Sequence, residues 1–347
     1  MPGALDELGG FDMGLLRRNH FCMGVKRGNE YQCGGEAGED AKSKAVELLA
    51  EAVRRILRWR VWETWWVEET MDEWLNARDR LEVQLKGKYV DEVVNGITWL
   101  VDKFISYNEQ FLNYWREVGN EVRKLIEDLT NGGAEVIIWE GEKGISVYYG
   151  HMTLEVEGVR SDDITVQLAL SDLEGMTIEV PDVFRKTMSR KEYRKFIKKM
   201  LKALRGGFEE TDGHVEKGKA AMSTTQIWQV IVWSLLYPGV SYIHVDDVNV
   251  NENGVTIKWH LKSGHKSIKG KILSDIGKLS EEEILTFVFT AVLGDGSAHI
   301  NKATVKGRIY NIAAIYITMS DKKFKRWVPL LERLKSMGFR SAKPSTK

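Results

Sequence analysis

The strongest constraint on this chain is a local pattern that occurs twice: an apolar segment of helical character that ends in Asp-Gly. The first copy, RGGFEETDG, ends at Asp212 and Gly213, and the second, VFTAVLGDG, ends at Asp295 and Gly296. The two aspartates are 83 residues apart. A single Asp-Gly is common in turns and often only marks the end of a helix, with glycine in the left-handed conformation. Two copies predict a pair of related helices.

The segments that follow the two copies are also alike. After the first comes MSTTQIWQVIVWSLLYPGV, which predicts a helix stopped by Pro-Gly, and then two strands around the turn NENG. After the second comes MSDKKFKRWVPLLERLKSMGF, which predicts a helix that starts near a serine and stops at a glycine. The order of motif helix, linker, Met-Ser, helix and glycine occurs twice, which indicates an internal duplication.

Both copies resemble the signature of the LAGLIDADG homing endonucleases, in which a helix ends in a small residue, Asp and Gly. In the first copy, Gly207 takes the small third position and Phe208 the apolar fourth. In the second copy, Thr290 takes the third position and Gly294 precedes the aspartate. The second copy departs at Leu293, where the family often has an acid that is not the metal-binding one.

The resemblance covers about residues 188–347 and implies a duplicated αββα domain that binds double-stranded DNA. It also implies that Asp212 and Asp295 are catalytic and hold Mg²⁺ for hydrolysis of a phosphodiester. Each aspartate would lie at the negative end of a helix dipole and repel the other, and a cation with hard oxygen ligands relieves both costs. Two helices can touch closely only where side chains are small. The small residues expected at this crossing are Gly206, Gly207 and Gly294.

Two departures leave open a degenerate remnant of the enzyme, or a truncated form of a longer protein. Only eight residues separate Gly213 from Met222, against 22 between Gly296 and Met319, so the first repeat lacks a long hairpin. The second repeat has no closing strands after its last helix. The stretch ALRGGFEETDGHV, with a Trp-rich helical region upstream, also resembles an archaeal paralogous repeat family of the PaRep type, for which no activity is assigned.

Strands with basic residues on one face are the expected DNA contacts. In residues 301–318, period-two alternation predicts Lys302 on the opposite face from Ile309 and Ile315, and 255–262 alternates similarly. A basic face above an apolar one suits a sheet that lies in a DNA groove, and phosphate contacts give salt-dependent affinity. The residues expected to contact DNA are Lys258, Lys262, Lys302, Lys306, Arg308 and Tyr310.

The distribution of charge supports a polyanionic partner. The formal net charge is +0, but residues 1–184 carry 20 basic and 35 acidic side chains and residues 185–347 carry 30 basic and 15 acidic. Ten of the basic residues and one acidic residue fall within 185–205. Such asymmetry favours contact of the basic half with nucleic acid. The alternative is an intramolecular contact in which the acidic half covers the basic half.

The rest of the chain predicts an α+β protein with four regions. Residues 1–40 are rich in glycine and predict a flexible N-terminus, and 132–187 predict a small antiparallel β region. Residues 41–131 predict a helical hairpin: one long helix, either straight or kinked, over 41–85, a turn near Gly87 and an amphipathic helix over 89–129. The region 188–347 is the LAGLIDADG-like domain. Ser189 is the expected N-cap of its first helix.

Several classes of protein are not indicated. No apolar run approaches the ~18 residues of a membrane span, and the N-terminus lacks a signal peptide, so we expect a soluble, cytoplasmic protein. Cys22 and Cys33 cannot make a disulfide scaffold, and no clustered Cys/His spacing indicates zinc. The candidate functions are a Mg²⁺-dependent DNA endonuclease or its remnant, a non-catalytic DNA-binding regulator on the same scaffold, and a protein–protein scaffold.

Overall fold

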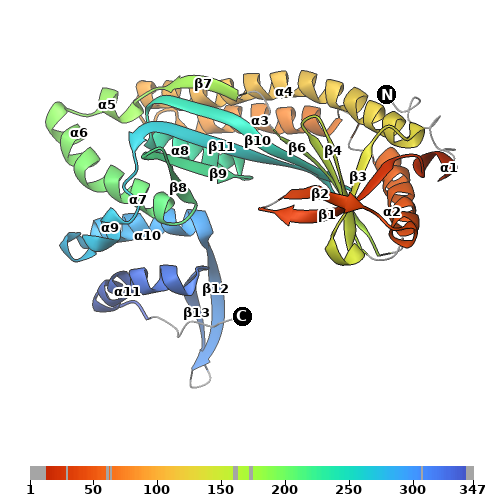
Figure 1. The fold of residues 1–347 in the computed structure, drawn as a ribbon. Helices are drawn as coiled ribbons and strands as arrows, with labels where there is room; N and C mark the ends of the chain where they lie inside the picture. The colour runs from red at the N-terminus through yellow and green to blue at the C-terminus, as the bar shows by residue number, and fades with distance from the viewer. Residues whose placement is uncertain are drawn as a thin grey trace. The chain divides into compact units, whose positions relative to one another are not determined.

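The structure, a computed structural model, describes residues 13–28, 30–59, 62, 65–158, 163–171, 175–305 and 308–340. These residues form a mixed α+β fold, which confirms the expected class (Figure 1). The chain divides into two compact units. Unit 1 comprises Met1–Gln84, Val101–Glu174 and Val245–Lys258, and unit 2 comprises Leu85–Leu100, Gly175–His244 and Trp259–Lys347. Among the described helices, none has the length and apolar character needed to cross a bilayer.

Unit 1 is built on a mixed sheet. Its strands are β1 (His20–Arg27), β2 (Glu30–Glu36), β3 (Glu135–Ile138), β4 (Gly144–Tyr149), β5 (Met152–Glu157) and β6 (Thr165–Ser171). They follow the order β2-β1-β3-β4-β5-β6, and the end of β10 (Gly239–Asn251) pairs with β6. The β1–β3 pair is parallel, and β3 to β6 form the antiparallel succession that the alternating sequence predicts. Side chains of β5 and β6 alternate between buried and partly exposed, as in a sheet with one face on a core.

The prediction of a flexible segment over residues 1–40 is wrong for residues 13–40. Strand β1 buries Phe21 and Cys22, and Cys22 is joined to Cys33 of β2 by a disulfide. The glycines do not make this segment flexible. At least one of them is needed because a neighbouring strand leaves no room for a side chain. A Cβ on Gly24 would lie 2.7 Å from Cγ2 of Ile137 on the neighbouring strand. Residues 1–12 lie outside the described part of the chain.

The predicted single helix over 41–85 is instead two helices, α2 (Glu39–Arg58) and α3 (Trp65–Leu85). Helix α2 ends at Trp59, whose backbone is extended, and the Trp62 indole donates a hydrogen bond to the carbonyl of Ile56 at 2.8 Å. The Trp62 ring also stacks on Trp59 and on Trp115, with ring centroids about 6.1 and 6.0 Å away. Packing of these large rings therefore overrides the helix propensity of the segment.

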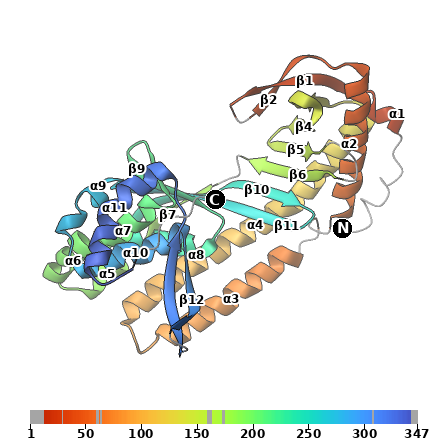
Figure 2. The same cartoon turned by 90° about the horizontal axis from the view of Figure 1, so that it is seen from below.

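Helix α3 lies beside the long helix α4 (Asp91–Asn131) (Figure 2). An ion pair of 2.9 Å joins Arg78 to Asp102, and Trp74 stacks on Phe104. The turn before α4 contains Gly87 in the left-handed conformation, with φ of 76°. The buried stripe of α4 repeats at intervals of three and four residues: Leu100, Phe104, Phe111, Trp115, Val118, Val122, Leu125 and Leu129.

Unit 2 begins with strand β7 (Gly175–Val180), which pairs with the first half of β10. After α5 (Val183–Thr187), a continuous helical stretch runs through α6 (Arg190–Phe196), a π-helical turn (Ile197–Leu201) and α7 (Lys202–Glu210). Ser189 caps α6 in a capping box with Glu192, which confirms the predicted N-cap. The hairpin of β8 (Gly213–Glu216) and β9 (Lys219–Thr224), helix α8 (Ile227–Leu236) and strand β11 (Gly254–Lys266) follow.

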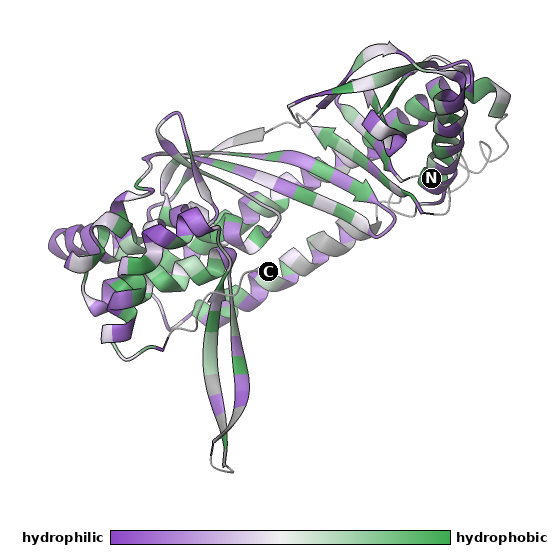
Figure 3. Cartoon of the chain, turned by 60° about the horizontal axis from the view of Figure 1, so that its bottom comes forward, coloured by the Kyte–Doolittle hydropathy of each residue, from purple (hydrophilic) through white to green (hydrophobic). Residues whose placement is uncertain are grey.

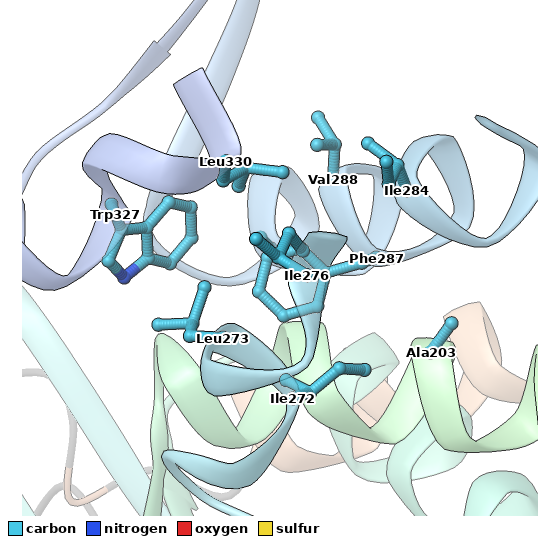
Figure 4. Packing of buried hydrophobic residues seen from close by; sticks show 10 residues of the cluster. Ala203, Ile272, Leu273, Ile276, Ile284, Phe287, Val288, Trp327 and Leu330 are labelled. Carbon is cyan, nitrogen blue, oxygen red and sulfur yellow. The ribbon is translucent and has the colours of Figure 1, made fainter. Parts of the chain in front are cut away.

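The remaining elements of unit 2 are helix α9 (Lys271–Ser274), helix α10 (Glu281–Asp295), strands β12 (Gly296–Val305) and β13 (Arg308–Ile317), and helix α11 (Asp321–Ser336). Aliphatic and aromatic side chains from α7, α9, α10 and α11 form one core (Figure 4). Phe287 of α10 and Trp327 of α11 are fully buried, with ring centroids 5.5 Å apart. This core packs the start of α7, at Ala203, against α9 and α10.

The β12–β13 hairpin extends well beyond the helices of unit 2 (Figures 1 and 2). Its register contradicts the predicted separation of basic and apolar faces. Lys302 pairs with Asn311, so it lies on the same face as Ile309 and Ile315, because antiparallel partners share a face. The chain reverses between Val305 and Arg308, and this two-residue connection exchanges odd and even positions. The hairpin therefore has both polar and apolar residues along its length (Figure 3).

Candidate functional site

Helices α7 and α10, which carry the two motif copies, pack in backbone contact. A Cβ on Gly207 would lie 2.8 Å from the backbone nitrogen of Ala291, and one on Gly294 would lie 2.9 Å from Oδ2 of Asp212. Real Cβ atoms do not approach so closely, so both positions require glycine for this crossing. Gly206 faces a different partner from the one expected. Its Cβ would meet Ile272 of α9, at 2.7 Å from Cδ1, and not the other motif helix.

The crossing brings Asp212 and Asp295 together. Burial, a hydrogen bond with Asp295 and the charge of Asp295 raise the pKa of Asp212 to about 7. The two carboxyl groups are hydrogen-bonded to each other and are partly buried. One proton shared between them removes the repulsion that two carboxylates would have at this distance.

Two side chains that the sequence did not single out complete the acid pair. Gln229 of α8 donates from Nε2 to Asp212 Oδ2 and to the carbonyl of Leu293, both at 3.0 Å. Lys323 of α11 donates from Nζ to Asp295 Oδ2 at 2.7 Å. The only signal for Gln229 is that a polar residue interrupts the apolar run IWQVIVW. Lys323 stands in a basic stretch, DKKFKR, whose members look alike in the sequence.

A basic cavity of about 250 Å³ lies beside the acid pair. Lys323 belongs to both, because it lines this cavity while it bonds to Asp295. Burial lowers the pKa of Lys269, which lines the cavity as well. The lining residues are Glu210, Lys269, Ser320, Lys322, Lys323 and Arg326. Four of these six side chains are cationic, so the cavity suits an anion.

Two further acids at the end of α7, Glu209 and Glu210, are fully buried and have structural partners. Glu209 accepts hydrogen bonds from the Tyr237 hydroxyl at 2.6 Å and from the Ile268 and Lys269 backbone nitrogens at 2.7 and 3.0 Å. Glu210 accepts from the backbone of residue 270 and from Arg326. These acids fasten the segment after β11 to α7 and have little capacity left for a ligand.

The residues expected to contact DNA are dispersed. Lys258 belongs to unit 1 and forms an ion pair with Asp246 at 2.9 Å. Lys262 belongs to unit 2 and forms an ion pair with Glu216. Lys302 is exposed in β12, and the backbones of Arg308 and Tyr310 belong to β13. Lys306 lies outside the described residues.

The acid pair has the donor set that a divalent cation with hard oxygen ligands prefers. Its two carboxyl groups already meet, and loss of their shared proton would leave two adjacent negative charges. A cation bound there would replace that proton. Comparison of the chain with protein-family models, with curated proteins and with solved structures gave no match. The chemistry of the site therefore has to be argued from its own geometry.

Proposed function

We propose that the chain is a DNA-binding protein of the LAGLIDADG type, with Mg²⁺-dependent phosphodiester hydrolysis at Asp212 and Asp295. One observation carries the proposal: two helices with related sequences cross at glycine, and each ends in an aspartate that contacts the other. Each motif helix is followed by a hairpin and a second helix, as α7-β8-β9-α8 and α10-β12-β13-α11. This repeated order supports a duplicated domain over 188–347.

Each residue around the acid pair has a role that its contacts support. Mg²⁺ held by Asp212 and Asp295 would supply an activated water and stabilise the leaving oxygen of the phosphodiester. Gln229 fixes the orientation of the Asp212 carboxyl through its hydrogen bond to Oδ2. Lys323 lies between the acid pair and the basic cavity, so its ammonium can turn to a phosphate oxygen while a cation occupies Asp295.

Affinity for DNA would come from exposed basic side chains of unit 2. Helix α6 and the residues flanking it are strongly hydrophilic (Figure 3). Eight of the ten basic residues in 185–205 are exposed: Arg185, Lys186, Arg190, Lys191, Arg194, Lys195, Lys198 and Lys199. Ion pairs to phosphates on such a surface give affinity without sequence preference and weaken as salt rises.

The test is a plasmid-nicking assay with Mg²⁺ on the native chain and on the Asp212→Asn/Asp295→Asn double variant. We expect the double variant to lose at least about 100-fold in rate, because each amide removes a charge that the cation requires. Asp275→Asn is the matched control, since Asp275 is a partly exposed acid of the same unit, paired with Lys278. Nicking by the native chain that persists in the double variant would rule out chemistry at this pair.

A non-catalytic DNA-binding regulator on the same scaffold is the second candidate. The observation in its favour is that Asp212 and Asp295 already have protein partners, Gln229 and Lys323. This candidate predicts no nicking by the native chain, together with retention of duplex DNA in EDTA that weakens steeply with salt. Retention that does not change with salt would contradict both candidates.

A further inference from the structure

A second cluster of potential ligands lies on the β8–β9–β11 part of unit 2 and shares no residue with the acid pair. His214, Glu216 and His260 each have a ligand atom within 4.8 Å of those of the other two. Nε2 of His260 is 3.0 Å from Oε2 of Glu216, and the rings of His214 and His260 have centroids 5.5 Å apart. All three side chains are partly buried. Two imidazoles and one carboxylate thus converge on one point.

The sheet explains why residues from β8 and β11 can meet across β9. His214 and Lys262 both pair with Ala221, and His260 pairs with Ser223, so all of these positions share one face. The β9 residues opposite the two histidines, Ala221 and Ser223, are small, and Ala221 is fully buried. The longer side chains of the flanking strands therefore close over β9. The opposite face buries Met222 and Leu261 and belongs to the core.

We propose that His214, Glu216 and His260 form a binding site for a first-row transition-metal cation of the Zn²⁺ type, separate from the Asp212–Asp295 pair. Neutral imidazole nitrogens and a carboxylate oxygen are the ligands of such cations, whereas Mg²⁺ prefers oxygen alone. Three protein ligands leave a fourth position for water or another small ligand. Bonds of about 2.0 Å in a tetrahedral site place ligand atoms roughly 3.3 Å apart, which small side-chain rotations reach from the present positions.

The surroundings set the imidazole orientation that metal binding needs. Nδ1 of His260 lies 3.1 Å from the hydroxyl oxygen of Ser223. Because a carboxylate only accepts, Nε2–H of His260 donates to Oε2 of Glu216 in the metal-free protein. A cation that replaces this hydrogen would bind Nε2, while Nδ1–H of the ring donates to Ser223. A hydrogen bond from the second ring nitrogen commonly fixes metal-bound histidines in this way. Ser223 is therefore a positioning residue for the site.

Lys262 is the group that competes with the cation. Its ammonium donates a hydrogen bond to Glu216. The bond goes to Oε1, whereas Oε2 faces His260. One carboxylate oxygen thus remains directed at the imidazoles while the other holds Lys262. The Lys262 side chain is about 29% exposed, so it can also swing into solvent when a cation enters.

The experiment is a titration of the chelator-treated full chain with Co²⁺, followed by its visible absorption, and then displacement by Zn²⁺ measured by calorimetry. We expect one equivalent of Co²⁺ to give the intense bands of a four- or five-coordinate ion, and excess Mg²⁺ should not displace the Co²⁺. The His214→Gln/His260→Gln variant should lose at least about 100-fold in affinity. Ser223→Ala should weaken binding by about 10- to 100-fold, since it removes only the positioning hydrogen bond.

Two controls keep the result specific. His299→Gln changes an exposed histidine on β12, and Asp212→Asn/Asp295→Asn changes the acid pair; both should keep the Co²⁺ bands and the Zn²⁺ affinity of the native chain. The bands report coordination directly, so a variant that only loosens the fold is distinguished by circular dichroism. Weak octahedral bands, binding unchanged in the double-histidine variant, or binding lost in the aspartate variant would each overturn the site.

Discussion

Three acids, Glu209, Glu210 and Asp212, lie within four residues of one another at the C-terminal end of α7. The two glutamates form a first set, and Asp212 with Asp295 forms a second set in different surroundings. Glu209 and Glu210 are fully buried and accept hydrogen bonds from hydroxyl, backbone and guanidinium donors. Asp212, two residues further on, faces a second acid, and the pKa of its carboxyl rises to about 7 through burial and contact with Asp295. The first set is fully paired with donors of the protein. The second has the donors Gln229 and Lys323, but it also holds two acids in contact, whose repulsion a proton or a cation would relieve.

This contrast separates a structural from a functional use of the same chemical group. A buried carboxylate with all of its acceptor sites occupied stabilises the segments that supply the donors. Two acids in contact lower the free energy of unfolding. Such pairs are typical of functional sites, where binding or catalysis requires them. Substitutions at the two sets should therefore change stability in opposite directions.

The largest effect is expected for Glu209→Ala. The substitution leaves the buried Tyr237 hydroxyl without its acceptor and removes the carboxylate that the backbone nitrogens of Ile268 and Lys269 donate to. We expect a loss of about 3–5 kcal/mol in the free energy of unfolding, measured by urea titration. Glu332→Ala, at an exposed acid of α11, should cost under about 1 kcal/mol. Equal losses in the two variants would remove the structural role of Glu209.

Gly207→Ala tests the crossing that holds the two aspartates together. The added methyl would lie 2.8 Å from the backbone nitrogen of Ala291, and backbone atoms cannot yield as a flexible side chain can. We expect the free energy of unfolding, measured by thermal denaturation, to fall by about 1–3 kcal/mol, as for other overpacked contacts. Gly277→Ala is the control, because a Cβ there meets nothing within 4 Å. A neutral Gly207→Ala would mean that α7 and α10 do not touch at this point.

The sequence predicted the acid pair because the pattern that forms it is local. Two apolar segments that end in Asp-Gly, with Gly207 five residues before Asp212 and Gly294 directly before Asp295, contain most of what places the two aspartates together. Gln229 and Lys323 could not be predicted in this way, since they lie 17 residues after Asp212 and 28 after Asp295 on different helices. The His214–Glu216–His260 cluster was invisible for the same reason: two of its residues are 44 positions apart and meet only across β9.

Two errors in the sequence-based fold have a physical explanation of another kind. The glycines in and around β1 led to the prediction of a flexible segment. In the structure, position 24 needs glycine because Ile137 lies against it. Along 301–318, period-two alternation was correct on each strand and wrong across the hairpin. The position of the two-residue turn decides which residues of the two strands share a face. Lys302 and Ile309 therefore lie on the same face of the hairpin.

The acid pair predicts a pH dependence of the metal-free protein. Because the folded pKa of Asp212 exceeds that of an unfolded aspartate (about 4), the unfolded chain releases a proton first as pH rises. The free energy of unfolding should therefore fall between about pH 4 and pH 7 and then stay level. Asp212 is only half-buried, so we expect the free energy of unfolding to fall by about 1–2 kcal/mol, which is less than the whole pKa shift would give. Asp212→Asn should reduce this slope; an unchanged slope, with EDTA present, would mean that other groups produce it.

The smallest effect on stability is expected for Lys323→Met, which removes the cation from Asp295 and keeps the length of the side chain. The pair is partly exposed, so the free energy of unfolding should change by under about 1 kcal/mol. The charge of Lys323 lowers the pKa of Asp212, so its removal should raise that pKa further, which a carboxyl ¹³C NMR titration measures.

Lys335→Met is the matched control for this substitution. It removes an exposed lysine from the same helix, paired with Glu332 at 2.8 Å, and should leave the titration of Asp212 unchanged. Identical titrations in the native chain and the Lys323→Met variant would mean that Lys323 does not act on the acid pair, and its assigned role beside the phosphate would lose its support. A raised pKa with unchanged stability would instead place Lys323 with Asp212 and Asp295, among the side chains held for a ligand rather than for the fold.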